Sequence, residues 1–265
     1  MSDSSKEKRS IDNMSDNMSD NMIRLDKIRP KILGHSQKGQ DSLIDHVFSV
    51  LGTSNKYYVE FGAYDGVQMC NSWYLKNKKG WSGLLLDNMF EDPSINLHKR
   101  HITKENVRGL FSEFEVPKEF DFLCVDMDGC DYWILEEVLL EYLPRVIMVE
   151  TAVRFGIHES MALKYNPNWS WNGRDWYGAS PYAFKKMLNR SNYIPIYIHE
   201  DDMLAVREDA LQDHGFVTPP WPYVYPEPRH ELYKNLLGHA DGDPRCDGKP
   251  RRYIAHPNEE EWQEV

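Results

Sequence analysis

The chain has 265 residues, enough for one large domain with a buried core. Acidic residues outnumber lysine and arginine by 42 to 31, and the net charge of −11 disfavours nonspecific attraction to nucleic acid or anionic membranes. No stretch approaches the ~18 consecutive apolar residues of a membrane-spanning helix, and the start of the chain lacks the apolar core of a signal peptide. We therefore expect a cytoplasmic protein that binds neither nucleic acid nor membrane. Its four cysteines show no C-x-x-C spacing, so neither a zinc ribbon nor a redox dithiol is indicated.

The chain divides into three regions by composition. Residues 1–22 are polar and repeat the letters SDNM, so they are expected to form a disordered tail that cannot bury enough apolar surface to fold. Residues 23–213 carry the regular pattern of strands and helices described below. Residues 214–265 contain TPPWPYVYPEP and a charged end, which predicts an extended strap on the domain with loose final residues.

The predicted elements alternate between strands and helices. LIDHVFSVL, residues 43–51, has the apolar spacing of an amphipathic helix ahead of the core. Short apolar runs that suit buried strands then alternate with helical segments, which is typical of a parallel sheet covered on both faces. The strands are expected at 57–61, 83–87, 99–102, 120–126 and 145–150, and the helices at 67–77, 103–111, 132–142 and 180–189.

The last two predicted strands differ from the others. Residues 192–198 and 203–207 both read as strands, and only residues 199–202 join them. Such a connection permits a hairpin but is too short for a parallel crossover. The predicted fold is therefore α/β, with a doubly wound, mostly parallel sheet that ends in an antiparallel hairpin.

The first strand ends in a glycine loop that suits a cofactor. Ligands of doubly wound sheets bind beyond the carboxyl ends of the strands. Here EFGAYDG places Glu60, Gly62 and Gly66, which do not form the G-x-G-x-x-G pattern of dinucleotide binding. S-adenosylmethionine has no pyrophosphate to cradle, and Asp87, 21 residues after Gly66, stands where an acid accepts ribose hydroxyls. The alternative is a simple strand-to-helix turn with a surface acid.

Three segments share their order and spacing with a known enzyme family. They read VEFGAYDGVQMCNSWYLKNKKGWSGLLLD, FDFLCVDMDGCDYWIL and PRVIMVE, and in the first of them Gly80, Trp81 and Gly83 form a G-W-x-G pattern. Residues 55–210 thus resemble the FkbM-like class of S-adenosylmethionine-dependent methyltransferases. The resemblance implies a class I methyltransferase sheet of seven strands with the last antiparallel.

The resemblance also implies roles for individual residues. Glu60, Gly62 and Gly66 would line the methionine end of the cofactor, and Asp87 would hold its ribose. Residues 102–106 would lie near the adenine, and Asp126 would face the cofactor or the substrate. Two departures shorten carboxylates by a methylene group, because Asp87 replaces a common glutamate and DMDGCD replaces the form D-x-E-G-x-E.

The stretch VDMDGCD contains three acids whose roles the sequence separates. An EF-hand is disfavoured because the fifth and sixth positions hold cysteine and aspartate. Asp131 precedes an apolar helix and is expected to cap it. Asp128 has no such structural role in the pattern, so with Asp126 it is the catalytic candidate, as a base for the proton of an oxygen acceptor. His158 is a further candidate base, which as a loop histidine more simply suits the surface.

The substrate side is predicted from the fifth strand and the loop after it. Glu150 ends that strand, and a magnesium ion shared with Asp126 is an alternative that the sequence permits but does not favour. The following loop is much longer than is usual in α/β units. We expect its Arg174, Trp176 and Tyr177 to contact the substrate, whereas the alternative is an aromatic plug over the sheet edge.

Two functions remain open from the sequence. The first is an S-adenosylmethionine-dependent methyltransferase that acts on an oxygen atom of a small-molecule or glycan-like hydroxyl, without a metal. The second is a non-catalytic binding protein that retains the same fold and uses its polar tail and aromatic loop for partner contacts. A dinucleotide or nucleotide-sugar enzyme is disfavoured by the glycine pattern.

Overall fold

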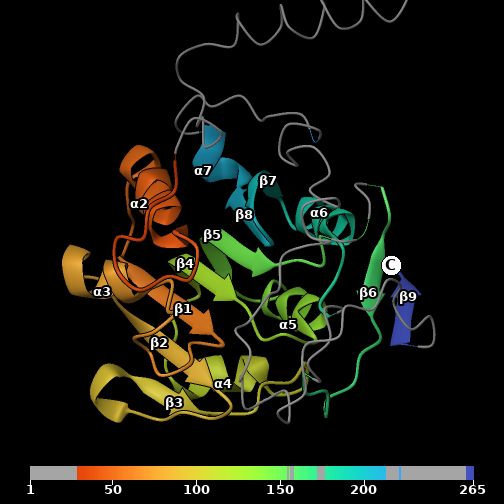
Figure 1. The fold of residues 1–265 in the computed structure, drawn as a ribbon, viewed down its shortest axis with the longest axis horizontal. Helices are drawn as coiled ribbons and strands as arrows, with labels where there is room; N and C mark the ends of the chain where they lie inside the picture. The colour runs from red at the N-terminus through yellow and green to blue at the C-terminus, as the bar shows by residue number, and fades with distance from the viewer. Residues whose placement is uncertain (1–28, 154, 156–157, 172–176, 213–220, 222–260) are drawn as a thin grey trace, which may run out of the picture.

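A mixed sheet of seven strands forms the centre of the computed structural model, which describes residues 29–153, 155, 158–171, 177–212, 221 and 261–265 (Figure 1). The strand order is β3-β2-β1-β4-β5-β8-β7. The pairs from β3 to β5 are parallel, whereas β5–β8 and β8–β7 are antiparallel. The strands are β1 Tyr57–Phe61, β2 Ser82–Asp87, β3 Leu97–Lys99, β4 Glu119–Val125, β5 Leu143–Glu150, β7 Tyr193–His199 and β8 Asp202–Arg207.

This order confirms the predicted fold. The chain crosses from β1 outward to β3, returns to pair β4 with β1, and ends in the hairpin β7–β8. That is the doubly wound arrangement of the class I methyltransferase fold, with the last strand inserted antiparallel beside its neighbours. The order reverses between β1 and β4, and such a reversal is where open α/β sheets bind their ligands.

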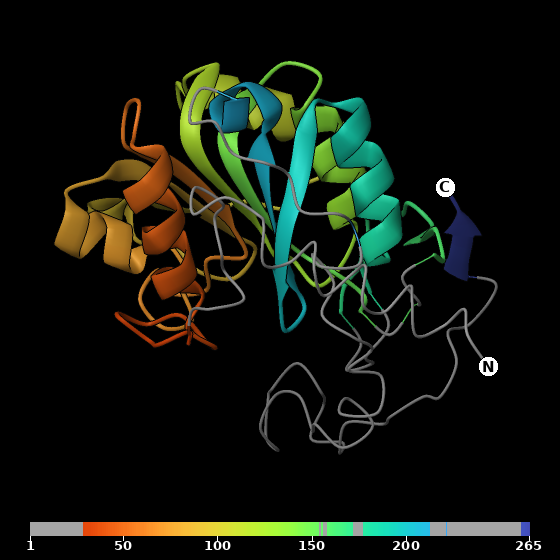
Figure 2. The same ribbon diagram turned by 90° about the horizontal axis from the view of Figure 1, so that it is seen from above.

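Helices cover both faces of the sheet, as Figure 2 shows. Leu43, Val47 and Phe48 of α2 pack with α3 and α7 against one face, and Phe111 and Leu135 belong to the core on the other face, which is formed with α4, α5 and α6. Burial of each such side chain contributes about 1.5–3 kcal/mol. The helices are α2 Gln40–Leu51, α3 Trp73–Lys79, α4 Val107–Glu113, α5 Asp131–Val138, α6 Pro181–Arg190, α7 Glu208–Gln212 and the 3₁₀ turn η2 Pro93–Ile95. Within the described part of the chain, no helix is long and apolar enough to cross a bilayer.

The predicted boundaries fail most clearly after β1, where a helix was expected at 67–77. α3 begins only at Trp73. The side chain of Asp65 accepts hydrogen bonds from the amides of Val67 and Gln68. Met69 adopts φ 57°, which is incompatible with a right-handed helix. The extra residues form an irregular loop instead. The strand expected at 99–102 is also shifted, because β3 ends at Lys99.

The end of the chain differs from its prediction as well. Residues expected to be loose form β9, Trp262–Glu264, which pairs antiparallel with β6, Met161–Leu163. This small second sheet lies beyond α6 at the border of the molecule (Figure 1). Residues 1–22 and most of 214–265 lie outside the described residues.

Candidate functional site

A cavity of about 600 Å³ opens at the carboxyl edge of the sheet. The ends of β1, β2, β4 and β5 form its floor, and segments 37–40 and 165–171 lie along its walls. Six of the side chains or glycines predicted from the sequence line it, whereas Glu60 and Gly66 do not. The lining includes Gly62, Asp87, Asp126, Asp128, Glu150, Tyr177, Asn71, Lys38, Ile102, Thr103, Tyr165, Trp169, Trp171 and Asp201.

Glu60 organises the loop beside the cavity. Its buried carboxylate accepts hydrogen bonds from the amides of Asn71 and Ser72, both at 2.8 Å, and from the hydroxyl of Ser72 at 2.5 Å. The Cys70 thiol donates to it as well. Burial raises the pKa of Glu60, and these hydrogen bonds act in the opposite direction. Glu60 therefore fixes the loop that carries Asn71 and does not reach into the cavity.

Asn71 presents an unsatisfied acceptor at this position. Its side chain is only 4% exposed and lines the cavity. The amide nitrogen donates to the sulfur of Cys124 at 3.5 Å, but Oδ1 is buried with no hydrogen-bond partner among the described residues. An unpaired buried acceptor costs about 1–3 kcal/mol, so a ligand that donates to it would recover that cost.

The two predicted glycines have different surroundings. Gly62 has φ 69°, and a Cβ atom there would lie 1.6 Å from the carbonyl oxygen of Asp126. The backbones of β1 and β4 therefore meet closely at the cavity floor, which only glycine allows. Gly66 has φ 74° and faces the side chains of Ile95 and Leu85 instead. Its role is to let the loop pack on β2.

Asp87 joins two loops at the end of β2. Its Oδ1 accepts from the amides of Met89 and Phe90, and its Oδ2 accepts from the amide of Tyr64 at 2.9 Å. A carboxylate offers about four acceptor positions. One position on Oδ2 is thus left for a ligand, which is less than the two that bidentate binding of a ribose would use.

Segment 164–171 crosses the loop between β3 and α4. The hydroxyl of Tyr165 donates to Glu105 at 2.5 Å and accepts from the amide of Lys104. The ring of His101 is bonded to the carbonyl of Pro167. These contacts place an aromatic wall beside Ile102 and Thr103, in the region where the family resemblance implies the adenine.

VDMDGCD forms the loop between β4 and α5. Asp131 was expected to cap α5, but Cys130 stands at the N-cap and Asp131 is the first helical residue. Its buried carboxylate instead accepts from the amides of Met127 and Gly129, both at 2.8 Å, and burial raises its pKa to about 6. Asp131 therefore holds the loop so that Asp128, with φ 54°, faces the cavity.

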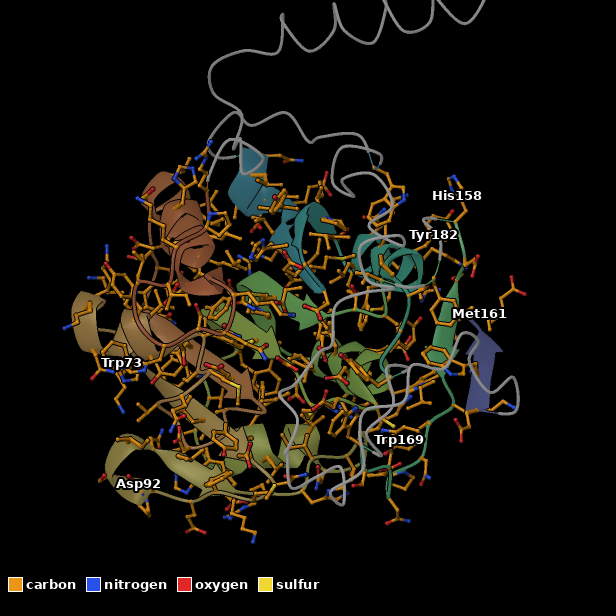
Figure 3. The ribbon with its side chains drawn as sticks, in the orientation of Figure 1. Trp73, Asp92, His158, Met161, Trp169 and Tyr182 are labelled. Carbon is orange, nitrogen blue, oxygen red and sulfur yellow. The ribbon has the colours of Figure 1, made fainter. Side chains whose placement is uncertain are left out.

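Trp169 covers this loop from the other side. Its Nε1 donates to the carbonyl of Asp128 at 3.1 Å. A Cβ atom on Gly129 would lie 2.8 Å from the Trp169 ring, so the ring rests directly on the glycine. Trp169 is labelled in Figure 3, well away from His158. His158 does not line the cavity and instead lies 6.1 Å from the ring of Tyr182.

Asp126 and Glu150 form a pair of acids at the ends of β4 and β5. Burial, and then the charge of Asp128, hold the pKa of Asp126 well above its usual range, and burial together with Asp126 does the same for Glu150. The hydroxyl of Tyr177 donates to Oε1 of Glu150 at 2.9 Å. Oε2 of Glu150 is buried and has no hydrogen-bond partner among the described residues. Both carboxyl groups therefore hold a proton more tightly than an exposed acid does.

The hairpin β7–β8 brings further charges to the same end. Lys38 donates to Asp201 at 2.6 Å, and Gln40 donates to the buried Asp202 at 2.7 Å. Burial alone would lower the pKa of Lys38, but Asp201 and Asp202 raise it. Burial, and then Asp201, raises the pKa of Asp202 to about 7. Residues 37–40 thus close the cavity opposite Trp169.

Among the described residues, no group of three or more His, Cys, Asp or Glu side chains is arranged to hold a metal ion. Arg174 and Trp176 lie outside the described residues. Sequence reasoning missed Asn71, Lys38 and Asp201. Asn71 follows an irregular loop that was predicted as helix. Lys38 and Asp201 form an ion pair although they lie 163 positions apart in the sequence. Neither feature therefore gives a local signal.

The comparisons with known proteins concern structures. No protein-family model and no curated protein matches the chain. Among solved structures, the chain is similar to the N-terminal domain of EvdMO1 in the presence of SAH and D-fucose, with 12% identity, a TM-score of 0.37 and coverage of 71% of this chain and 98% of that one. It is also similar to an O-methyltransferase family protein from Burkholderia thailandensis, with 8% identity, a TM-score of 0.35 and coverage of 67% and 63%.

A third similar structure is the MycE methyltransferase from the mycinamycin biosynthetic pathway in complex with Mg and SAH, with 13% identity, a TM-score of 0.35 and coverage of 76% of this chain and 54% of that one. The chain thus spans less than two thirds of the second and third of these structures. Because the TM-scores lie below 0.5, the fold assignment rests on the order and register of this chain's own strands.

Proposed function

We propose that this protein is an S-adenosylmethionine-dependent methyltransferase that acts on an oxygen atom of a small-molecule or glycan-like hydroxyl. The observation that carries the proposal is the buried, unpaired Oδ1 of Asn71 at the reversal point of the sheet, in a cavity that continues to the acids of β4 and β5. A donor of the cofactor's amino-acid portion would satisfy this oxygen.

The residues along the cavity fit the proposed cofactor. Gly62 leaves its backbone bare beside Asn71, where the methionine portion would approach. Asp87 has one acceptor position for a ribose hydroxyl, and Ile102 with Thr103 offers a partly apolar seat for the adenine. Glu60 supports this end through the loop it holds. This assignment keeps the predicted cofactor region but replaces direct contact by Glu60 and Gly66 with contact by Asn71.

The chemistry needs positioning more than covalent participation. S-adenosylmethionine supplies a methyl group on a sulfonium, which is displaced in line by the acceptor atom. Asp128 and Asp126 face the part of the cavity beyond Gly62, and either carboxylate can accept the hydroxyl proton. Trp169 and segment 37–40 limit the access of water from two sides. Arg174, Trp176 and Tyr177 complete the proposed acceptor contacts.

Titration with S-adenosylmethionine by isothermal calorimetry tests the proposal. The intact protein should bind it with micromolar affinity, and Asp87→Ala should weaken binding about 10- to 100-fold because a charged acceptor and two loop anchors are lost. Asp92→Ala is the matched control, since Asp92 is exposed and its side chain accepts hydrogen bonds from Ser94 of the same turn, at the β3 side of the molecule (Figure 3). Absence of detectable binding by the intact protein would refute the proposal.

A second measurement separates an enzyme from a binding protein of the same fold. The protein is incubated with S-adenosylmethionine and, in turn, with each of a panel of monosaccharides. One of these sugars should lead to release of S-adenosylhomocysteine, the demethylated cofactor. Asp128→Asn should abolish this release by at least ~100-fold while the affinity for S-adenosylmethionine stays within about twofold. Cofactor binding without release for the whole panel would favour the non-catalytic function. The FkbM-like family and a cytoplasmic location remain parts of the proposal.

A further inference from the structure

One side of the cavity is closed by a segment that belongs to no helix or strand. Residues 165–169 follow β6, and Tyr165, Pro167 and Trp169 line the cavity. Figure 3 labels Met161 on β6 and Trp169 nearer the middle of the molecule, so the segment runs inward from the border. Loops that lie over a cavity in this way often act as lids.

The segment starts from a fixed strand. β6 pairs with β9 along one edge, and on the other edge the amide of Leu163 donates to the carbonyl of Gly178 at 2.9 Å. The indole of Trp133 donates to the carbonyl of Leu163 at 2.7 Å. Ala162 and Leu163 are fully buried. A strand that is bonded on both edges stays in place when the residues after it move.

Beyond β6, side chains hold the segment to the loop between β3 and α4. The hydroxyl of Tyr165 donates to Glu105 at 2.5 Å and accepts from the amide of Lys104 at 3.0 Å. The ring of His101 is bonded to the carbonyl of Pro167. Each of these bonds uses a side chain at an exposed or partly buried position. They can therefore break while the sheet and its backbone hydrogen bonds stay intact.

The same segment is also held to the loop between β4 and α5. The indole of Trp169 donates to the carbonyl of Asp128 at 3.1 Å, and the thiol of Cys130 donates to the carbonyl of Asn166 at 3.4 Å. One short segment thus joins the loop beside the proposed adenine seat to the loop that carries the proposed catalytic acid. A movement at either end is transmitted to the other.

We propose that residues 165–169 form a lid that opens for exchange of the cofactor and closes over its nucleoside, with the hydroxyl of Tyr165 as the latch. The inference rests on the proposed methyltransferase function and adds how the bound cofactor is retained. Closure also brings Trp169 onto the carbonyl of Asp128, so the lid couples retention of the cofactor to the position of the acid. The alternative is a fixed wall that stays as closed as β6.

A latch acts by favouring the closed state. Release of a covered ligand requires opening, so its rate rises with the fraction of time that the lid is open. Tyr165→Phe removes two hydrogen bonds and keeps the ring that lines the cavity. Release should accelerate about tenfold, which corresponds to about 1.4 kcal/mol of lost latch energy.

The first experiment measures release of labelled S-adenosylhomocysteine from the full chain during a chase with the unlabelled compound. Tyr165→Phe should speed release about tenfold and Glu105→Ala about threefold. The double variant should be no faster than Tyr165→Phe, because both changes break the same latch. Tyr193→Phe is the matched control and should leave release unchanged. Its hydroxyl donates to the carbonyl of Pro144 at 2.7 Å on the edge strand β7, outside the cavity.

The second experiment measures opening itself, in the free protein. Cys130 is buried beneath the segment, whereas Cys124 is buried in β4 and reports global unfolding. N-ethylmaleimide modification of each cysteine is followed by mass spectrometry of the peptides. Tyr165→Phe should raise the modification rate of Cys130, relative to that of Cys124, about tenfold. Tyr193→Phe should leave this ratio unchanged.

Each result decides the inference. An unchanged release rate or an unchanged cysteine ratio in Tyr165→Phe overturns the lid in favour of a fixed wall. An equal acceleration in Tyr193→Phe also overturns it, because the effect would then follow overall stability. Binding of S-adenosylhomocysteine is measured first. If it binds and Tyr165→Phe has no effect, only the lid fails, whereas failure to bind refutes the proposed function itself.

Discussion

The two ends of β4 treat a buried acid in opposite ways. Asp121, near the amino end, is fully buried and bonded to the amides of Ser54, Asn55 and Lys56 and to the guanidinium of Arg145 at 3.0 Å. Asp126 follows the carboxyl end and has other acids as its neighbours. Asp121 at the amino end of β4 is therefore paired with a cation, whereas Asp126 at the carboxyl end forms no ion pair with a cation among the described residues. An acid whose pKa is perturbed in this way at a cavity indicates a ligand or a reaction.

The largest expected effect concerns the compensated end. Asp121→Ala should lower the free energy of unfolding by about 3–5 kcal/mol, because it leaves a largely buried Arg145 and three amides without their acceptor. Urea denaturation measures this loss. Affinity for S-adenosylmethionine, measured below the unfolding transition, should not change, since Asp121 lies at the opposite edge of the sheet.

The control for that prediction is Glu119→Ala on the same strand. Glu119 pairs with Arg207 at 3.1 Å but is 65% exposed, so its removal should cost less than about 1 kcal/mol. A loss for Asp121→Ala no larger than that for Glu119→Ala would break the comparison, because the amino edge would then carry no special compensation.

The second prediction concerns the uncompensated end and its response to pH. The pKa of Asp131 is raised to about 6 and that of Asp202 to about 7, and those of Asp126 and Glu150 are raised as well. The folded state therefore binds protons more tightly than the unfolded state. This contribution to stability is complete below about pH 4 and is lost as pH rises through 6 and 7.

Stability should accordingly fall between pH 5 and pH 8, by on the order of 2 kcal/mol, since each unit of pKa shift corresponds to about 1.4 kcal/mol. Urea midpoints at the two pH values measure the change. Glu150→Gln should flatten the dependence and raise stability at pH 8, whereas Glu91→Gln should leave the dependence as it is. A stability that rises from pH 5 to pH 8 would contradict the assignment of uncompensated acids.

The comparison also explains what the sequence could predict. Near-continuous apolar runs such as YYVEF and FDFLCV predict the strands, and the short connection predicts the hairpin, so the mostly parallel sheet and its antiparallel end were accessible. The strand-end rule then brought Gly62, Asp87, Asp126 and Glu150 to one cavity. These features depend on spacing along the chain, which a sequence displays directly.

Features that depend on orientation were not accessible. Glu60 and Gly66 stand where the pattern places cofactor contacts, yet Glu60 turns its carboxylate to the loop at 70–72 and Gly66 packs against Ile95. Asp131 folds back onto its own loop instead of capping α5. The pairing of Lys38 with Asp201 needs the hairpin and the segment before α2 to meet in three dimensions. None of these has a local periodicity to reveal it.

The smallest effect tests the wall above the uncompensated end. Trp169→Phe keeps most of the ring over Gly129 but removes the hydrogen bond to the carbonyl of Asp128. Trp133→Phe is a matched control, because its Nε1 donates to the carbonyl of Leu163 at 2.7 Å and the residue does not line the cavity. Both substitutions should reduce stability by about 1 kcal/mol, the worth of one such bond.

Only Trp169→Phe should also affect catalysis. Loss of its hydrogen bond frees the loop that presents Asp128, so the rate of methyl transfer should fall by about threefold, and Trp133→Phe should leave that rate unchanged. Thermal unfolding and the release of S-adenosylhomocysteine measure the two effects on the same samples. Equal losses of rate in both variants would mean that Trp169 acts only through overall stability. The contrast between the two ends of β4 would then not extend to the wall that covers the cavity.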